Sequence, residues 1–96
     1  MTSYTRSQLL ALLEIEDTFL VALELEEIVM DDARSGQDPG YSERMLERAR
    51  VAHNLVQELD VNLPGVSIIL RMREEMAELR HQMAEVLGEL KRRGES

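Results

Sequence analysis

The chain has 96 residues, a formal net charge of −8 and no cysteine. Its length allows one domain with a modest core, and the missing cysteine excludes disulfides, a thiolate nucleophile and a cysteine-based zinc site. The negative charge disfavours nucleic acid as a partner, because neutralising phosphates supplies most of the affinity of DNA-binding proteins. The apolar runs are far shorter than a membrane span, and the first residues lack a secretion-signal pattern. We therefore expect a cytoplasmic protein that binds no membrane.

Two short helices are predicted in the first third of the chain. Thr5 and Gln8 have the spacing of a capping box, so a first helix of about two turns should begin after Thr5. Glu16 and Asp17 favour the positive end of a second helix. Two short helices with such a brief connection are typical of a helix-turn-helix motif. The inward face of the second helix should carry Phe19, Leu20, Leu23 and, as a further candidate, Val21.

A small β-hairpin wing is predicted to follow these helices. Residues 28–30 are apolar and strand-like, and residues 31–40 have the composition of an exposed turn. Tyr41 would pair back across this turn. Ser42 should then cap a third helix, which Asp60 ends. The inward positions of that helix follow the helical spacing at Met45, Ala49, Ala52, Val56 and Leu59.

The strongest periodicity belongs to a long fourth helix, for which Asn62 is a suitable N-cap and Pro64 fits the first turn. Apolar residues recur alternately three and four positions apart, as in a coiled coil. After Ile69, this seam consists of Met72, Met76, Leu79, Met83, Val86 and Leu90. A small domain cannot bury so long a seam, so we expect homodimerisation through it; the alternative is that the helix folds back on its own domain.

The chain should thus comprise two parts. Residues 63–70 supply further apolar side chains that are suited to packing inside the domain, so the domain should extend over residues 1–70. Residues 71–96 should form the dimerisation helix with a short charged tail.

The order of these elements resembles the MerR type of winged helix-turn-helix protein. The specific part of the resemblance is the segment from Leu55 to Leu70, with Asn62-Leu63-Pro64-Gly65 at its centre, and the following residues up to Leu79. This segment is similar to that of the chaperone modulators of the CbpM branch and of the related heat-shock repressor HspR. The implied fold is all-α with a small β wing: a MerR-like domain followed by a long coiled-coil helix.

The resemblance implies two alternative functions. CbpM-like proteins bind the J-domain of a DnaJ-type co-chaperone of the CbpA class and restrain its activity. HspR-like and MerR-like proteins are dimeric regulators that bind promoter DNA. A third possibility, independent of the resemblance, is a dimerisation module with another client.

Charge placement favours the protein partner. Residues 7–33 contain no lysine or arginine and eight carboxylates, which would oppose DNA. Arg34 and the third-helix residues Arg44, Arg48 and Arg50 would have to outweigh them. The same charge suits the basic surface of a J-domain, which also engages Hsp70; the alternative is that the carboxylates only keep the domain soluble. The predicted contact residues are Glu24, Glu26, Glu27, Asp31 and Asp32.

No pattern predicts an enzyme, a metal site or a cofactor. His53 lies beside the apolar stripe of the third helix and should be a half-buried packing residue. His81 follows Glu78 in a Glu-x-x-His spacing with Glu85 beyond it, but di-metal helical bundles need two such motifs. A surface position is the better interpretation of His81.

Overall fold

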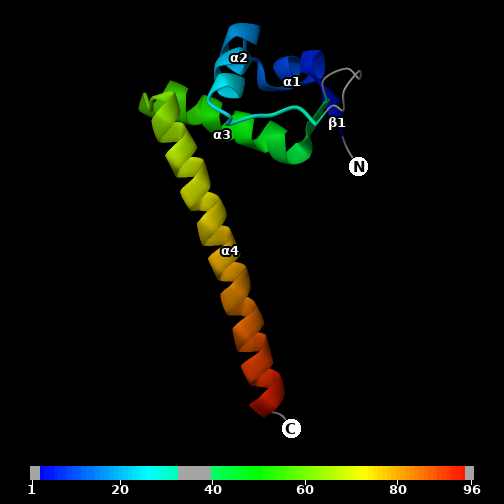
Figure 1. Ribbon diagram of the computed structural model, residues 1–96, viewed down its shortest axis with the longest axis vertical. Helices are drawn as coiled ribbons and strands as arrows, with labels where there is room; N and C mark the ends of the chain where they lie inside the picture. Colours follow the sequence, from blue (N-terminus) through cyan, green and yellow to red (C-terminus); the bar gives the residue numbers. More distant parts are fainter. Residues whose placement is uncertain (1–2, 33–39, 95–96) are drawn as a thin grey trace.

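The computed structural model describes residues 3–32 and 40–94. The α1, α2 and α3 helices form a compact head, and the end of α4 projects far beyond it (Figure 1). Helices dominate, and the described strands form one two-stranded sheet, as the all-α prediction with a small β element requires. The elements are β1 (Ser3–Thr5), α1 (Arg6–Leu13), α2 (Asp17–Leu25), β2 (Gly40–Ser42), α3 (Glu43–Leu59) and α4 (Leu63–Gly94).

Side-chain caps start three of the helices where the sequence predicts them. Thr5 Oγ1 accepts from the Gln8 amide at 3.1 Å while Gln8 Oε1 accepts from the Thr5 amide at 2.9 Å, which completes the capping box of α1. Ser42 Oγ accepts from the Met45 amide at 3.2 Å at the start of α3. Asn62 Oδ1 accepts from the Gly65 amide at 2.8 Å at the start of α4. These bonds satisfy amides that have no partner inside the helix.

The predicted hairpin is wrong. Tyr41 pairs with Tyr4, because β2 lies antiparallel to β1 at the start of the chain. Residues 28–30 are not a strand: Ile28 and Val29 are fully buried, and both of their amides donate to the Leu23 carbonyl at the end of α2. Their apolar side chains are used for packing into the core and not for sheet formation. Of the predicted turn, residues 33–39 lie outside the described residues, and with them Arg34.

The core lies between the three helices of the head and the first two turns of α4. In α3, Met45, Ala49 and Ala52 are buried as predicted and Val56 packs against the core. Leu59, predicted to face inward, is the last residue of α3 and is 68% exposed. The buried residues are Leu9, Ile15, Leu20, Leu23, Ile28, Val29, Tyr41, Met45, Leu46, Ala49, Ala52, Val66 and Leu70.

The projecting part of α4 buries none of its described side chains. Beyond Leu70, every described residue is exposed or half-exposed, and the predicted seam residues are each between 50% and 60% exposed. The seam is therefore an apolar strip on the surface of a single chain. None of the helices in the described part of the chain is both long and apolar enough to cross a lipid bilayer.

Candidate functional site

The helix-turn-helix motif is built by α1 and α2 and the three residues between them. Glu14 ends α1 in the left-handed conformation (φ 54°), and Ile15 then donates its amide to the Leu10 carbonyl at 3.2 Å. Leu9, Leu20 and Leu23 face the core with no exposed surface. The turn thereby fixes α2 against α1 and leaves one side of each helix at the surface.

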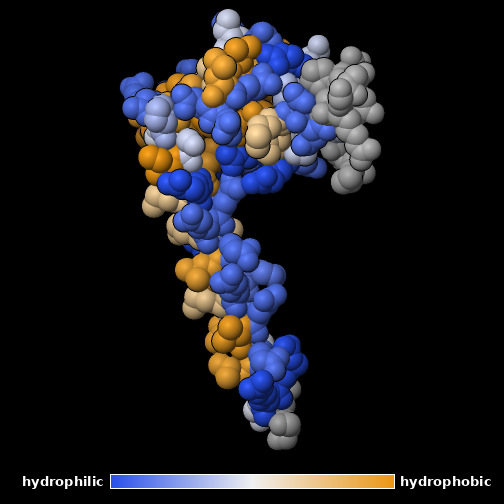
Figure 2. All heavy atoms as spheres, in the orientation of Figure 1, coloured by the Kyte–Doolittle hydropathy of each residue, from blue (hydrophilic) through white to orange (hydrophobic). Residues whose placement is uncertain are grey.

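That outer side carries apolar residues. Leu12 on α1 is 60% exposed, and Val21 and Leu25 on α2 are 40% and 80% exposed. Figure 2 shows apolar side chains at the surface over α2. Val21, a candidate for the inward face, lies four residues before Leu25 and shares its outer face instead. The signal for this outer face was present in the sequence: Val21 and Leu25 lie four residues apart on one side of α2, away from the inward positions of Leu20 and Leu23.

The same segment also exposes acidic residues. Between Ser7 and Asp32 the sequence has eight carboxylates and no lysine or arginine. Seven of the eight are exposed, and Glu24 is half-buried. This surface therefore combines exposed apolar side chains with exposed carboxylates. We call it the helix-turn-helix face; it consists of Leu12, Val21, Leu25, Glu26, Glu27, Met30, Asp31 and Asp32.

Arg6 is the only lysine or arginine among residues 3–32, and two carboxylates bind its guanidinium group. Its Nε donates to Asp17 Oδ1 at 2.7 Å and its Nη1 donates to Glu24 Oε1 at 2.8 Å. The same Nη1 donates to the Tyr41 hydroxyl at 2.9 Å, which in turn donates to Glu24 Oε2 at 3.1 Å. Charge-assisted bonds of this kind hold a guanidinium in place. Arg6 therefore joins the start of α1 to α2 and β2.

This network raises the pKa values of Arg6 and Tyr41. Hydrogen bonds to Asp17 and Glu24 raise the pKa of Arg6, so it is always charged. Burial raises the pKa of Tyr41, and the Glu24 carboxylate that accepts from its hydroxyl raises it further. The neutral phenol is thus the stable form in the folded chain. Sequence reasoning missed the network because its members come from three separate elements, α1, α2 and β2.

The five predicted contact residues fall into two groups. Glu24 is committed to Arg6 and Tyr41 inside the head, with 26% of its side chain exposed. Glu26 and Glu27 are exposed directly after α2, where Glu27 has a positive φ of 59°. Asp31 and Asp32 are exposed as well, and the Asp32 amide donates to the Gly40 carbonyl at 2.6 Å. The last four residues can contact a partner without disturbing the Arg6 network.

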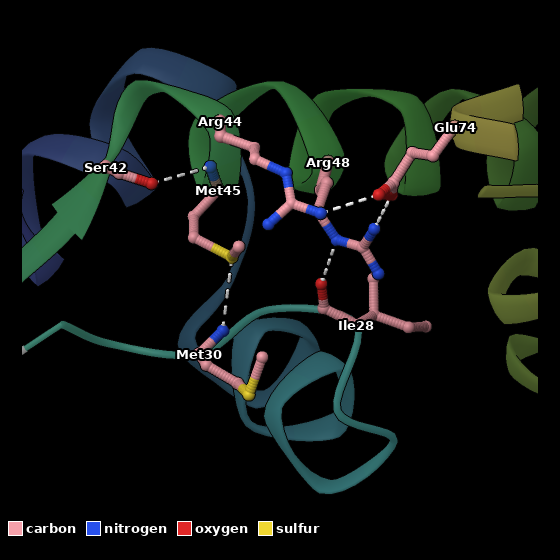
Figure 3. A network of polar contacts seen from close by, with 7 residues as sticks. All are labelled: Ile28, Met30, Ser42, Arg44, Met45, Arg48 and Glu74. Carbon is pink, nitrogen blue, oxygen red and sulfur yellow. Dashed lines mark hydrogen bonds and ion pairs between the residues drawn. The ribbon is translucent and has the colours of Figure 1, made fainter. Parts of the chain in front are cut away.

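A second polar cluster connects α4 to the head, at the junction drawn in Figure 3. Glu74 of α4 accepts from Arg48 and, at 2.6 Å, from Arg44 Nη2, both on α3. Arg48 Nε also donates to the Ile28 carbonyl at 2.6 Å, behind the helix-turn-helix motif. Burial, with a smaller contribution from the Arg44 charge, lowers the pKa of Arg48. Glu74 supplies the opposite charge that a half-buried cation needs.

Both histidines have structural neighbours. His53 is half-buried and its ring packs edge-on against Phe19 at a centroid distance of 5.6 Å, which confirms the predicted packing role. His81 is exposed, and its Nε2 lies 3.1 Å from Glu85 Oε1. Within residues 3–32 and 40–94, no group of three or more potential ligands could hold a metal ion.

The combination of a helix-turn-helix head, a two-stranded sheet and a projecting helix is typical of helix-turn-helix regulators. Comparison with family models gives a match over residues 4–87 to the MerR HTH family regulatory proteins. The chain therefore belongs to the MerR family of helix-turn-helix regulatory proteins. Comparison with curated proteins finds no match.

Proposed function

We propose that the protein is a dimeric, protein-binding regulator whose helix-turn-helix face binds the J-domain of a DnaJ-type co-chaperone and restrains its activity. One observation carries the proposal. The outer sides of α1 and α2 expose Leu12, Val21 and Leu25 together with carboxylates, although α2 is the helix that enters the major groove in DNA-binding helix-turn-helix proteins. Exposed apolar patches with polar edges are typical of protein-binding surfaces.

The surroundings of α2 oppose DNA binding. A helix in the major groove needs donors and cations for bases and phosphates, whereas α2 carries Asp17 and Glu24 and no cation. Arg6 lies within reach of α2, but it is already bound to both of these carboxylates. Approach of the phosphate backbone would therefore meet like charges, and the only guanidinium group among residues 3–32, that of Arg6, is already bound.

The resemblance of the segment from Leu55 to Leu79 to the chaperone modulators supports the choice of a J-domain. J-domains present a basic helix, to which the exposed carboxylates of the helix-turn-helix face are complementary. Charge complementarity orients the partners and speeds association, and burial of Leu25 and its apolar neighbours adds affinity. Because Hsp70 uses the same basic helix, the mechanism would be occlusion.

The proposal is tested by charge reversal at the exposed carboxylates only. Glu26→Lys with Glu27→Lys should weaken binding to a J-domain protein by about tenfold or more, because a basic partner then meets two cations. Glu24 is left unchanged because it bonds Arg6. The matched control is Glu58→Lys with Glu75→Lys, which changes net charge equally at exposed sites outside the face. Equal affinities of both variants in isothermal titration calorimetry would exclude this surface.

The apolar part of the helix-turn-helix face is tested by Leu25→Ser. This side chain is 80% exposed, so its replacement should leave the thermal unfolding of the free protein unchanged. Co-purification with the J-domain protein should be lost, as expected for an anchor residue at an interface centre. Full retention of the partner would show that binding occurs elsewhere.

Binding of promoter DNA is the alternative, because the family is one of helix-turn-helix regulators. A gel shift at low salt is the most sensitive test, since electrostatic attraction to DNA is then strongest. The proposed function predicts no shift of the promoter DNA of the gene that encodes this protein. A shift that Arg44→Ala and Arg48→Ala abolish would support the DNA-binding regulator.

Dimerisation through α4 is part of the proposal. It is supported by the seam Met72, Met76, Leu79, Met83, Val86 and Leu90, which is exposed along the projecting part of the helix. Pairing with a second copy would remove this strip from water, and the dimer would present the helix-turn-helix face twice.

A further inference from the structure

A cleft of about 560 Å³ lies in the angle between α3 and α4. Its floor is apolar and consists of Val51 from α3 and Leu70, Met76 and Ala77 from α4. This volume is within the range of small-molecule sites, which combine an apolar lining with a few convergent polar groups. The cleft is separate from the helix-turn-helix face, so a ligand bound in it is independent of the proposed contact with a J-domain.

The cleft is positively charged on a negatively charged protein. Four arginines line it, together with the carboxylates of Glu47 and Glu74. Glu74 is bound to Arg44 and Arg48, and Glu47 is bound to Arg50. The other two lining arginines, Arg73 and Arg80, form no ion pair with any described residue. They are exposed, so their guanidinium groups are available to an anion.

This face of α4 is distinct from the dimerisation seam. At about 100° per residue, Arg73, Ala77 and Arg80 continue the face on which Leu70 enters the core. The seam is centred about a quarter of a turn away, and only Met76 borders both. In Figure 2 apolar atoms follow one edge of α4, whereas hydrophilic atoms follow the edge beneath α3. Arg73 and Arg80 each come one residue after a seam residue, so they would stand at the margin of a second copy on the seam, on the side that faces the cleft.

We propose that this cleft binds a small amphipathic anion, namely a free alkyl carboxylate of fatty-acid type. The carboxylate is held by Arg73 and Arg80, since guanidinium groups form paired, charge-assisted hydrogen bonds with carboxylates. The alkyl chain lies over Val51 and Ala77, beside Met76 at the border with the seam, and is removed from water there. Charge complementarity selects the anion: a cationic amphiphile of equal length meets the same floor but four guanidinium groups.

The test is calorimetric titration of decanoate, below its micelle concentration, into the full-length protein. The variant Arg73→Ala with Arg80→Ala should bind decanoate at least about tenfold more weakly, because both head-group donors are lost. The matched control Arg71→Ala with Arg92→Ala also removes two positive charges from α4, but at positions outside the cleft. It should bind decanoate within about twofold of the unchanged protein.

Methyl NMR spectra locate the ligand. Decanoate should shift the signals of Ala77 and Met76 and leave Met83 and Val86 of the distal seam unchanged. Absence of decanoate binding, equal weakening by the two arginine pairs, equal binding of decyltrimethylammonium, or shifts confined to Met83 and Val86 would each overturn the proposal. The last result would mean that the alkyl chain binds the seam.

Discussion

The two parts of α4 have similar periodicity but different surroundings. Residues 63–70 place Val66 and Leu70 in the core of the head, whereas no described side chain between residues 71 and 94 is buried. Burial of an aliphatic side chain contributes about 1.5–3 kcal/mol, so the first part is stabilised by tertiary packing and the second is not. Isolated helices are marginal in water without such packing. Packing within one chain therefore explains the stability of the head, but it does not explain the stability of the projecting helix.

The largest expected effect is on the seam. Leu79→Glu places a carboxylate at the middle of the proposed dimer contact in both copies. Loss of two buried leucines and burial of two charges should raise the dimer dissociation constant by about a hundredfold or more. Size-exclusion chromatography with light scattering should show the mass of a single chain at concentrations where the unchanged protein has twice that mass.

The matched control is Gln82→Glu, which adds the same charge to α4 at a position outside the seam. It should leave the dimer intact. If the unchanged protein has the mass of one chain at all concentrations, the dimer proposal is wrong, and the exposed seam must be covered by a different partner.

The second effect is on the head, and it compares two leucines of α2. Leu23 has no exposed surface, so Leu23→Ala should lower the free energy of unfolding by about 2–5 kcal/mol through lost burial and a cavity. Leu25 is 80% exposed, so Leu25→Ala should lower the free energy of unfolding by less than about 0.5 kcal/mol. Chemical denaturation measures both. Similar losses for the two variants would contradict the orientation of α2.

A third effect is the pH dependence of the head. The pKa of Tyr41 is raised in the folded chain above its ordinary value of 10.0, chiefly by burial. The unfolded chain therefore loses this proton first as the pH rises. The resulting stability is complete below pH 10 and should be lost above it, by at most about 1.4 kcal/mol per pH unit.

The variant Tyr41→Phe has no phenol to titrate, so its stability should fall less steeply above pH 10 than that of the unchanged protein. Only the slopes are compared, because the substitution also removes the hydrogen bonds with Arg6 and Glu24. Unfolding midpoints in denaturant, measured across this pH range, provide the slopes. Parallel slopes would contradict the raised pKa of Tyr41.

The smallest effect is expected at the end of α1. Glu14 has a left-handed backbone (φ 54°, ψ 44°), in which a β-carbon is disfavoured and glycine is not. Glu14→Gly should therefore raise the free energy of unfolding by about 0.5–1 kcal/mol. Glu47→Gly, inside α3, should instead lower it by about 1 kcal/mol. A loss of stability in both variants would show that Glu14 has a contact that outweighs its backbone strain.

Local signals in the sequence predicted the helices well. The capping residues Thr5, Ser42 and Asn62 each form the expected hydrogen bond, because a cap involves residues only three positions apart. The helical spacing of Met45, Ala49 and Ala52 likewise identified the buried face of α3. The resemblance of the segment from Leu55 to Leu79 led to the MerR family, which the family comparison confirms.

Contacts between distant segments were not predictable in this way. The strand-like character of Ile28 and Val29 suggested a hairpin, but burial and pairing of Tyr41 with Tyr4 were more favourable. Of the predicted contact residues, Glu24 is bound inside the head, and only the fold brings it to Arg6, which lies 18 residues away. For the other four, the role in partner binding stays a prediction.

The sequence by itself determined where the helices begin, the excess of negative charge on the helix-turn-helix motif and the continuous apolar seam of α4. These properties depend on residue type and on the 3.6-residue period of the helix, so neighbours along the chain suffice. Only the tertiary structure decided which strands pair, which carboxylates remain exposed and that Arg73 and Arg80 border an apolar cleft. Each of these depends on surfaces from different elements meeting in space, and a linear pattern does not record which surfaces meet.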